Sequence, residues 1–290
     1  MARVAHRLAG NAPGRFFVDD SCIDCDACRQ LAPRVFARAG DQSIVVAQPD
    51  DGDAAATERA LMALVACPTA SIGAQPLAKA GAARAAAARF PERIGDGDIY
   101  YCGYHSADSY GAASYLIVRA RGNVLVDSPR AARPLMARLA ALGGVAQLVL
   151  THRDDVADHE QLARRFGCRR VMHAADAGRL SIEQRVDGAD PIPLADDLLL
   201  IPVPGHTRGS LALLHDGVLF TGDHVWWDDE LGRLDAGRDV CWYSWTEQLQ
   251  SLKRLLQYSF HTILPGHGRR FHAESPAAMR VELERLLHAL

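Results

Sequence analysis

The sequence has no long apolar run, since nowhere in its 290 residues do 18 apolar residues follow one another. This argues against a transmembrane helix. The first 20 residues are broken by Arg3, Arg7, Pro13 and Gly14, so they lack the apolar segment of a signal peptide. No stretch carries five or six like charges, and the net charge is −3. We therefore expect a cytoplasmic protein that binds neither nucleic acid nor a membrane.

An internal repeat is also absent, so no solenoid or propeller is expected. A chain of 290 residues, about half of them apolar, is long enough for one large and one small domain. Seven cysteines are present, and four of them belong to one motif. That distribution argues against a disulfide framework and favours a metal or redox use in a reducing compartment.

The N-terminal motif consists of Cys22, Cys25 and Cys28, followed 39 residues later by Cys67-Pro68. Three cysteines at i, i+3 and i+6 let one tight loop wrap three corners of a cubic cluster, and a distant Cys-Pro supplies the fourth ligand. The spacing predicts one [4Fe–4S] cluster. The alternative is a structural zinc ion held by the same four thiolates, although zinc sites usually come as paired Cys-x₂-Cys.

The segments DDSCIDCDACRQLAPRVF and ACPTASI resemble single-cluster bacterial ferredoxins over the first 75 residues or so. We expect a ferredoxin-like domain at residues 1–77, an Ala-rich linker at 78–97 and a second domain at 98–290. Cys102, Cys168 and Cys241 are scattered singly and are interpreted as small buried apolar residues rather than ligands.

The second domain alternates short β-rich runs with amphipathic helices, which favours sheets covered by helices. The predicted strands are residues 99–101, 115–119, 124–126, 148–150, 198–203, 211–214, 218–221 and 262–264. The predicted helices are residues 134–142, 159–166, 244–258 and 276–290. Ser275-Pro276 adds an N-cap followed by proline at the first helical position.

Polar residues follow several of these strands: His152 to His159 in THRDDVADH, His206 in PGHTRGS, Asp223 in FTGD and His267 in PGHG. Imidazoles and carboxylates gathered at one sheet edge are what a pair of divalent metals needs. The arrangement resembles the metallo-β-lactamase superfamily over residues 98–290. The resemblance implies an α+β chain in which the small ferredoxin-like domain precedes a four-layer αββα sandwich.

The resemblance also implies a set of metal ligands, with Asp223 as the bridge between two metal ions. One metal would be bound by His152, Asp154, His206 and Asp223, and the other by Asp158, His159, His267 and the same Asp223. Asp158 would in addition accept the proton of the attacking water.

The first motif departs from the family pattern His-x-His-x-Asp-His, because the second His is missing and two extra residues intervene. Asp154 or Asp155 falls where that His would be. A carboxylate there tilts the preference from zinc toward iron or manganese, and flavodiiron proteins of the same superfamily also have a carboxylate in this motif.

The remaining histidines are interpreted as ordinary surface or core residues: His6, His105, His173, His215, His224, His261, His272 and His288. All four tryptophans fall between Trp226 and Trp245, directly after the Asp223 loop. They either line an apolar substrate pocket or lid, or they pack in the core.

Three functions follow from these features. The first is a glyoxalase II-like metallo-hydrolase that cleaves a small thioester, lactone or phosphodiester, with a fused iron–sulfur electron-transfer module. The second is an oxidoreductase in which the cluster, fed by a redox partner protein, supplies electrons to a non-haem di-iron site. The third is a redox or binding scaffold that has lost its metals. The hydrolase is the preferred hypothesis.

Overall fold

The computed structural model describes residues 2–75 and 80–290. The end of the predicted ferredoxin-like domain and the first two residues of the predicted linker lie outside the described residues. The chain divides into two compact units. Unit 1 is Met1–Val124, Pro129–Val145 and Ala157–Phe166, and unit 2 is Leu125–Ser128, Ala146–Val156 and Gly167–Leu290. The boundaries at residues 77 and 98 stay a prediction.

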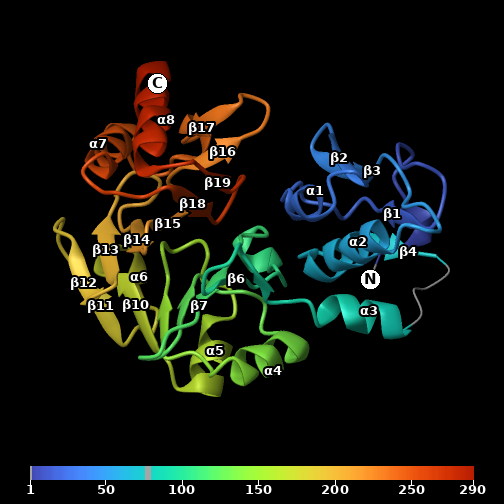
Figure 1. The fold of residues 1–290 in the computed structure, drawn as a ribbon, viewed down its shortest axis with the longest axis horizontal. Coiled ribbons are helices and arrows are strands. Elements are labelled where there is room, and N and C mark those ends of the chain that lie inside the picture. Colours follow the sequence, from blue (N-terminus) through green and yellow to red (C-terminus); the bar gives the residue numbers. More distant parts are fainter. Residues whose placement is uncertain (1, 76–79) are drawn as a thin grey trace. The chain divides into compact units, whose positions relative to one another are not determined.

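The first part of unit 1 is a small module of short strands and helices that contains the cysteine motif in its sequence (Figure 1). β1 (Phe16–Val18) pairs antiparallel with β4 (Ile72–Ala74), and β2 (Phe36–Ala39) forms a hairpin with β3 (Gln42–Val45). The helices are η1 (Val4–His6), α1 (Ala27–Leu31), α2 (Ala54–Ala66) and α3 (Ala80–Ala87). The Asp53 side chain caps α2 by accepting the Ala56 N–H, which satisfies a donor that the first turn leaves open.

The second part of unit 1 holds a three-stranded antiparallel meander and two helices. β5 (Glu92–Arg93) pairs with β6 (Ile99–Tyr101), and β6 pairs with β7 (Tyr115–Ile117). η2 (Ala107–Ser109) lies between β6 and β7, and α4 (Arg133–Ala141) and α5 (His159–Phe166) complete the unit. β8 (Val124–Val126) crosses the division between the two units.

Unit 2 contains two groups of strands. β9 (Gln147–Val149), β10 (Arg169–His173) and β11 (Gln184–Val186) pair in parallel. A six-stranded sheet has the order β12-β13-β14-β15-β18-β19. Its strands are β12 (Ile192–Ala195), β13 (Leu198–Pro202), β14 (Leu211–His215), β15 (Val218–Gly222), β18 (Thr262–Pro265) and β19 (Phe271–His272). All pairs in this sheet are antiparallel except β15 with β18, which are parallel.

α7 (Trp245–Leu255), α8 (Pro276–Ala289) and a hairpin pack on this sheet, and the two helices pack against each other (Figure 1). α6 (Ala174–Ala177) instead follows β10 and contacts β10 and β11. Ser275 caps α8 as its sequence predicts, because its side chain accepts the Ala278 N–H. β16 (Trp226–Asp228) pairs with β17 (Arg233–Asp235), and η3 (Arg238–Val240) follows.

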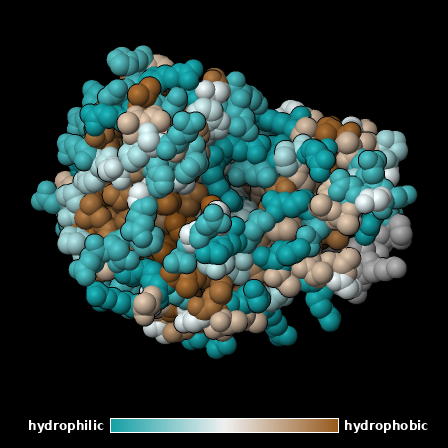
Figure 2. Space-filling view, viewed as in Figure 1, coloured by the Kyte–Doolittle hydropathy of each residue, from teal (hydrophilic) through white to brown (hydrophobic). Residues whose placement is uncertain are grey.

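The core of unit 2 is formed by apolar side chains of β13, β15, β18, α7 and α8, among them Ile201, Leu219, Leu252, Ile263 and Leu283. Hydrophilic residues predominate on the face drawn in Figure 2, in keeping with the burial of these side chains. No helix within residues 2–75 and 80–290 combines the length and apolar character needed to cross a bilayer. The strands and helices described above give the fold class α+β, with a small N-terminal domain and an αββα sandwich.

Candidate metal centre and iron–sulfur site

The candidate metal ligands of unit 2 come from loops that follow strands. His152 comes three residues after β9, and His206 follows β13. Asp223 and His267 follow β15 and β18, which run parallel with Gly222 opposite Pro265. Parallel strands end at the same edge of a sheet, so this register places the Asp223 and His267 loops side by side.

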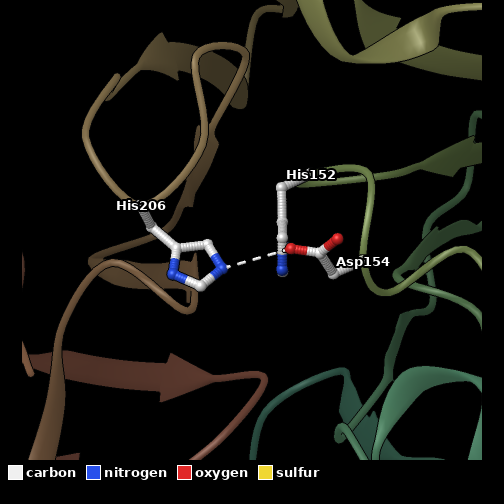
Figure 3. A group of neighbouring side chains, drawn as sticks. All are labelled: His152, Asp154 and His206. Carbon is white, nitrogen blue, oxygen red and sulfur yellow. Dashed lines mark ion pairs between the residues drawn. The ribbon is translucent and has the colours of Figure 1, made fainter. Parts of the chain in front are cut away.

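His152, Asp154 and His206 form the first group of candidate ligands, and one ligand atom of each lies within 4.8 Å of the others. The Nε2 atom of His206 is 3.5 Å from Oδ2 of Asp154. Figure 3 shows the three side chains reaching toward one another from two loops. The two imidazole rings meet edge to face, with 4.8 Å between their centroids.

His152, Asp155 and Asp223 form the second group, which shares His152 with the first. His152 Nε2 is 3.5 Å from Oδ2 of Asp223 and 3.9 Å from Oδ2 of Asp155. His267 joins this group, because its Nδ1 lies 2.8 Å from Oδ2 of Asp223 and its backbone N–H donates to Oδ1. A Cβ on Gly266 would lie 2.7 Å from carboxylate oxygens of both Asp155 and Asp223, so only glycine fits there.

Asp155 is the residue that the sequence leaves as an alternative to Asp154, and the geometry gives each aspartate a place in one group. Asp155 is 1% exposed, whereas the Asp154 side chain is 45% exposed. Both carboxylates therefore belong to the candidate centre. The sequence contains both candidates as the pair Asp154-Asp155 after His152, but it does not determine which of the two side chains is buried.

The buried polar atoms of this centre fit divalent metal ions. Within the described part of the chain, His152 Nε2, both Asp155 oxygens and both ring nitrogens of His206 have no hydrogen-bond partner. Buried polar atoms are normally hydrogen-bonded, and leaving them without partners costs free energy. Imidazole nitrogens and carboxylate oxygens are ligands for zinc, iron and manganese. Cations coordinated here would satisfy these atoms.

The pKa values of the candidate ligands are shifted by burial and by the charges of neighbouring ligands. Burial raises the pKa of Asp155 well above its usual range, and the negative charge of Asp223 adds to the effect. Burial works against a charged His152, yet the charges of Asp155 and Asp223 raise its pKa to about 10. The pKa of His267 is raised to about 9, because Asp223 outweighs burial. These shifts thus reflect a buried concentration of negative charge that divalent cations would neutralise.

Two buried aspartates outside the ligand set hold the ligand loops. Asp127 accepts the backbone N–H of Thr151 at 2.8 Å and also its hydroxyl, next to His152. Asp176, in α6, accepts the Arg153 N–H at 3.1 Å, the Thr207 hydroxyl at 2.5 Å and the Gly209 N–H at 2.8 Å. Asp176 therefore connects the loop of His152 with the loop of His206. Sequence reasoning missed both residues, since neither lies in a recognisable motif.

Asp158 and His159 are in neither group of candidate ligands. Both lie in unit 1. The two carboxylate oxygens of Asp158 accept hydrogen bonds from the Gln161 side chain, at 2.6 Å, and from the Ala131 N–H, at 2.8 Å. His159 is the first residue of α5 and is 4% exposed. Their predicted roles as ligands and, for Asp158, as proton acceptor stay predictions.

His224, interpreted from the sequence as an ordinary histidine, is a buried neighbour of the centre. It is 1% exposed, and neither ring nitrogen has a hydrogen-bond partner in residues 2–75 and 80–290. Burial lowers its pKa to about 3, and the charge of His206 adds to this. Gln248 of α7 donates to the His224 carbonyl at 2.7 Å, which ties α7 to the Asp223 loop.

The four tryptophans have different surroundings. Trp227 stacks on Phe271 with 4.3 Å between the ring centroids, and Trp245 packs against the core at the start of α7. Trp226 fills the space beside Gly268, where a Cβ would meet its ring. Trp242 is 61% exposed, and its ring lies 6.4 Å from that of His206. Trp242 and Tyr243 both donate their backbone N–H to the His206 carbonyl, which fixes this loop beside the centre.

The cysteine motif of unit 1 lines a second site. Cys22, Cys25, Cys28 and Cys67 surround one cavity together with Val18, Ser43 and Thr69. Burial raises the pKa of the Cys25 thiol, and the charges of the other three cysteines raise it further. The Ser43 and Ser71 N–H groups each point at a sulfur, of Cys22 and Cys67 respectively, at 3.3 Å. Such N–H···S contacts are typical of iron–sulfur sites.

Two family models match the chain, one over the cysteine motif and one over part of unit 2. Residues 18–74 match the family model described as the 4Fe-4S single cluster domain of ferredoxin I. Residues 182–267 match the model of the metallo-beta-lactamase superfamily. Residues 18–74 are therefore similar to a ferredoxin-type 4Fe-4S domain, and residues 182–267 to a metallo-β-lactamase domain.

Curated relatives are similar to part of the chain. A hydroxyacylglutathione hydrolase of Anaeromyxobacter dehalogenans (strain 2CP-C) is 35% identical over 127 residues, which cover 41% of this chain and 48% of the relative. A second, of Fuscovulum blasticum, is 35% identical over 155 residues, covering 50% and 59%. The match thus spans about half the length of these relatives. 

Solved structures show the same fold. The DIM-1 metallo-β-lactamase exposed to ceftazidime aligns with a TM-score of 0.51 and 16% identity over 67% of this chain and 95% of that one. VMB-1 at pH 5.5 aligns with a TM-score of 0.50 and 14% identity, again over 67% and 95%. At these identities the likeness concerns the fold alone.

Proposed function

We propose that the protein is a metal-dependent hydrolase that cleaves a small acyl or phosphoryl compound, with a thioester of the hydroxyacylglutathione type as the first choice over lactones and phosphodiesters. The observation that carries this proposal is the pair of overlapping ligand groups around His152, whose buried nitrogens and oxygens have chemistry suited to divalent cations. The family match of residues 182–267 and the hydroxyacylglutathione hydrolase relatives support it.

Metal ions bound here would lower the pKa of water and polarise the carbonyl or phosphoryl oxygen of the substrate. The chain itself supplies the ligands, namely His152, Asp154, Asp155, His206 and Asp223, and His267 beside Asp223. As the acceptor of the proton of the attacking water we propose Asp158, on the ground of its place in the motif THRDDVADH alone. The exposed ring of Trp242 offers an apolar surface for the substrate.

An oxidoreductase is the second candidate, and the number of carboxylate ligands favours it. The centre contains three carboxylates, Asp154, Asp155 and Asp223, and an oxygen-rich set suits iron or manganese better than zinc. A 4Fe–4S cluster chiefly carries electrons, which hydrolysis does not need. In this alternative, a redox partner protein would reduce the cluster and the cluster would reduce a di-iron site.

The full chain, purified anaerobically, tests both candidates. Zinc, manganese and iron(II) forms are assayed with a hydroxyacylglutathione thioester, a lactone and a phosphodiester, beside His206→Ala and the matched exposed control His288→Ala. We expect turnover in at least one metal form, its loss in His206→Ala and its retention in His288→Ala. Turnover no faster than that of His206→Ala in every form would contradict the hydrolase.

Metal counting separates the second candidate from the first. About four irons and four sulfides per chain belong to the cluster, as a Cys22→Ser variant would reveal by losing them. About two further irons without sulfide, reoxidised by a substrate without hydrolysis, would favour the oxidoreductase. Absence of any further metal would favour a binding scaffold.

A further inference from the structure

The loop that carries three of the cluster cysteines has an unusual backbone. Asp24 lies between Cys22 and Cys25, Asp26 lies between Cys25 and Cys28, and their φ angles are +56° and +65°. Residues with a Cβ rarely adopt the left-handed region, although aspartate does so more readily than most. Contacts that hold Asp24 and Asp26 in this conformation therefore stabilise the loop.

Arg29 contacts both of these aspartates. Its Nε donates to Oδ1 of Asp26 at 2.5 Å, and its Nη1 donates to Oδ1 of Asp24 at 2.5 Å. The Arg29 side chain is 10% exposed, and the aspartate side chains are 16% and 18% exposed. A planar guanidinium with donors in a fixed fork suits this task, because it holds two carboxylates at a defined separation.

The same guanidinium is linked to the sulfurs. Nη1 of Arg29 also donates to the Ser43 hydroxyl at 2.7 Å, and the Ser43 N–H points at Cys22 Sγ. Arg29 is also the residue next to Cys28 in the chain, so its guanidinium belongs to the network that surrounds the cysteine loop.

We propose that Arg29 is a positioning residue of the iron–sulfur site, which presets the Cys22–Cys28 loop through Asp24 and Asp26 and raises the reduction potential of the cluster. Reduction adds one negative charge to the cluster, so a buried cation beside it favours the reduced form. This proposal does not depend on the hydrolase activity, since it concerns only the module around the cysteines.

Three variants of the full chain, reconstituted anaerobically with iron and sulfide, test it. Arg29→Gln removes the charge and the fork, Arg29→Lys keeps the charge without the fork, and Arg34→Gln is the control. The Arg34 side chain is 78% exposed and pairs with Asp53 over 3.5 Å. The readouts are iron and sulfide per chain, the rate of cluster loss to a chelator, and the reduction potential from an EPR-monitored titration.

We expect Arg29→Gln to lose its cluster several-fold faster and to have a more negative potential than the unchanged chain. Arg29→Lys should also lose the cluster faster but keep a potential near that of the unchanged chain, and Arg34→Gln should alter neither. If Arg29→Gln binds the cluster with an unchanged reduction potential, the claim that the charge of Arg29 raises the potential is overturned. If Arg29→Lys loses the cluster no faster than the unchanged chain, the claim that Arg29 presets the Cys22–Cys28 loop is overturned.

If Arg29→Gln does not fold, Asp24→Asn with Arg29 in place supplies the potential measurement. Removing a negative charge from the same network should shift the potential in the positive direction. A null result there would overturn the claim that the charges of this network act on the cluster.

Discussion

Asp176 and Gly209 lie so close that a Cβ on residue 209 would come within 2.7 Å of the Asp176 Cγ. The Gly209 N–H donates to Asp176 Oδ1, and the other oxygen accepts from Arg153 and Thr207. One carboxylate thereby spans the two loops that carry His152 and His206. The spacing of these two ligands depends on a residue that touches neither imidazole.

We expect Asp176→Ala to weaken metal binding about 10- to 100-fold, as the loss of a residue that orients metal ligands typically does. The physical reason is that the loops of His152 and His206 lose their common anchor. Metal affinity is measured by competition with a chelator, and circular dichroism checks that the variant is folded. Asp187→Ala, at an exposed position of unit 2, is the control. Equal metal affinity in Asp176→Ala and in the control would refute the anchoring role.

Asp155 and Asp158 should respond differently to removal of their charge. Asp155→Asn is expected to lose metal, because a buried carboxylate among His152, Asp223 and His267 becomes a weak amide ligand. Asp158→Asn is expected to keep stoichiometric metal and lose turnover, if Asp158 accepts the proton from water. Elemental analysis and the hydrolysis assay on the same preparations separate the two effects. Metal loss in Asp158→Asn would instead support its assignment as a ligand.

Trp242 is expected to contribute to substrate binding. Its exposed ring lies beside His206, and the backbone of its loop is hydrogen-bonded to the His206 carbonyl. Trp242→Ala should raise KM about tenfold for a thioester with a large apolar acyl group, with little effect on kcat. A short acyl group makes less contact and should show a smaller change. An equal effect on both substrates would argue for a general disturbance of the loop.

The ion pair between Glu183 and Arg170 is expected to make a pH-dependent contribution to the free energy of unfolding. Arg170 lowers the pKa of Glu183 to about 2, through hydrogen bonds at 2.5 and 2.9 Å. Because the folded pKa lies below the ordinary value near 4.5, the contribution is complete above pH 4.5 and is lost as the pH falls toward 2. The Glu183 side chain is 42% exposed, so Glu183→Gln should cost only about 0.5–1 kcal/mol at neutral pH.

Chemical denaturation of the unchanged chain and of Glu183→Gln, at neutral pH and in acid, measures this difference. The exposed helical pair Arg280–Glu284 offers a control in Glu284→Gln, whose effect should be smaller. If the free energy of unfolding of Glu183→Gln differs from that of the unchanged chain by the same amount at pH 2 as at neutral pH, the ion pair with Arg170 is not the cause of the difference.

The sequence predicted much of the fold because its periodic segments are strong signals. The strand at residues 99–101 coincides with β6 and the helix at 159–166 with α5. The helix predicted to reach residue 258 ends at Leu255 instead, since the apolar pattern continues into a turn that packs on the core. β16 and β17 escaped prediction, because many residues from Trp226 to Asp235 are charged and mask the pattern of a strand.

At the candidate centre, sequence motifs singled out His206, Asp223 and His267 as candidate ligands, because a Gly-His or Gly-Asp turn after a strand is a local signature. His152 was singled out as the start of the motif THRDDVADH. Local sequence could not reveal which of Asp154 and Asp155 points inward, since that depends on the backbone turn after His152. It also could not reveal Asp176, whose partners Arg153, Thr207 and Gly209 are distant in the chain. Long-range hydrogen bonds of this kind leave no periodic pattern.

The parallel register of β15 and β18 also limits how this chain can evolve. Each residue inserted into a strand turns every side chain beyond it to the opposite face of the sheet. An added residue within β18 would therefore move His267 away from Asp223, whereas added residues between β17 and α7 would leave the pair in place. Changes in length between the strands are thus tolerated better than changes within β15 and β18, because those two strands deliver Asp223 and His267.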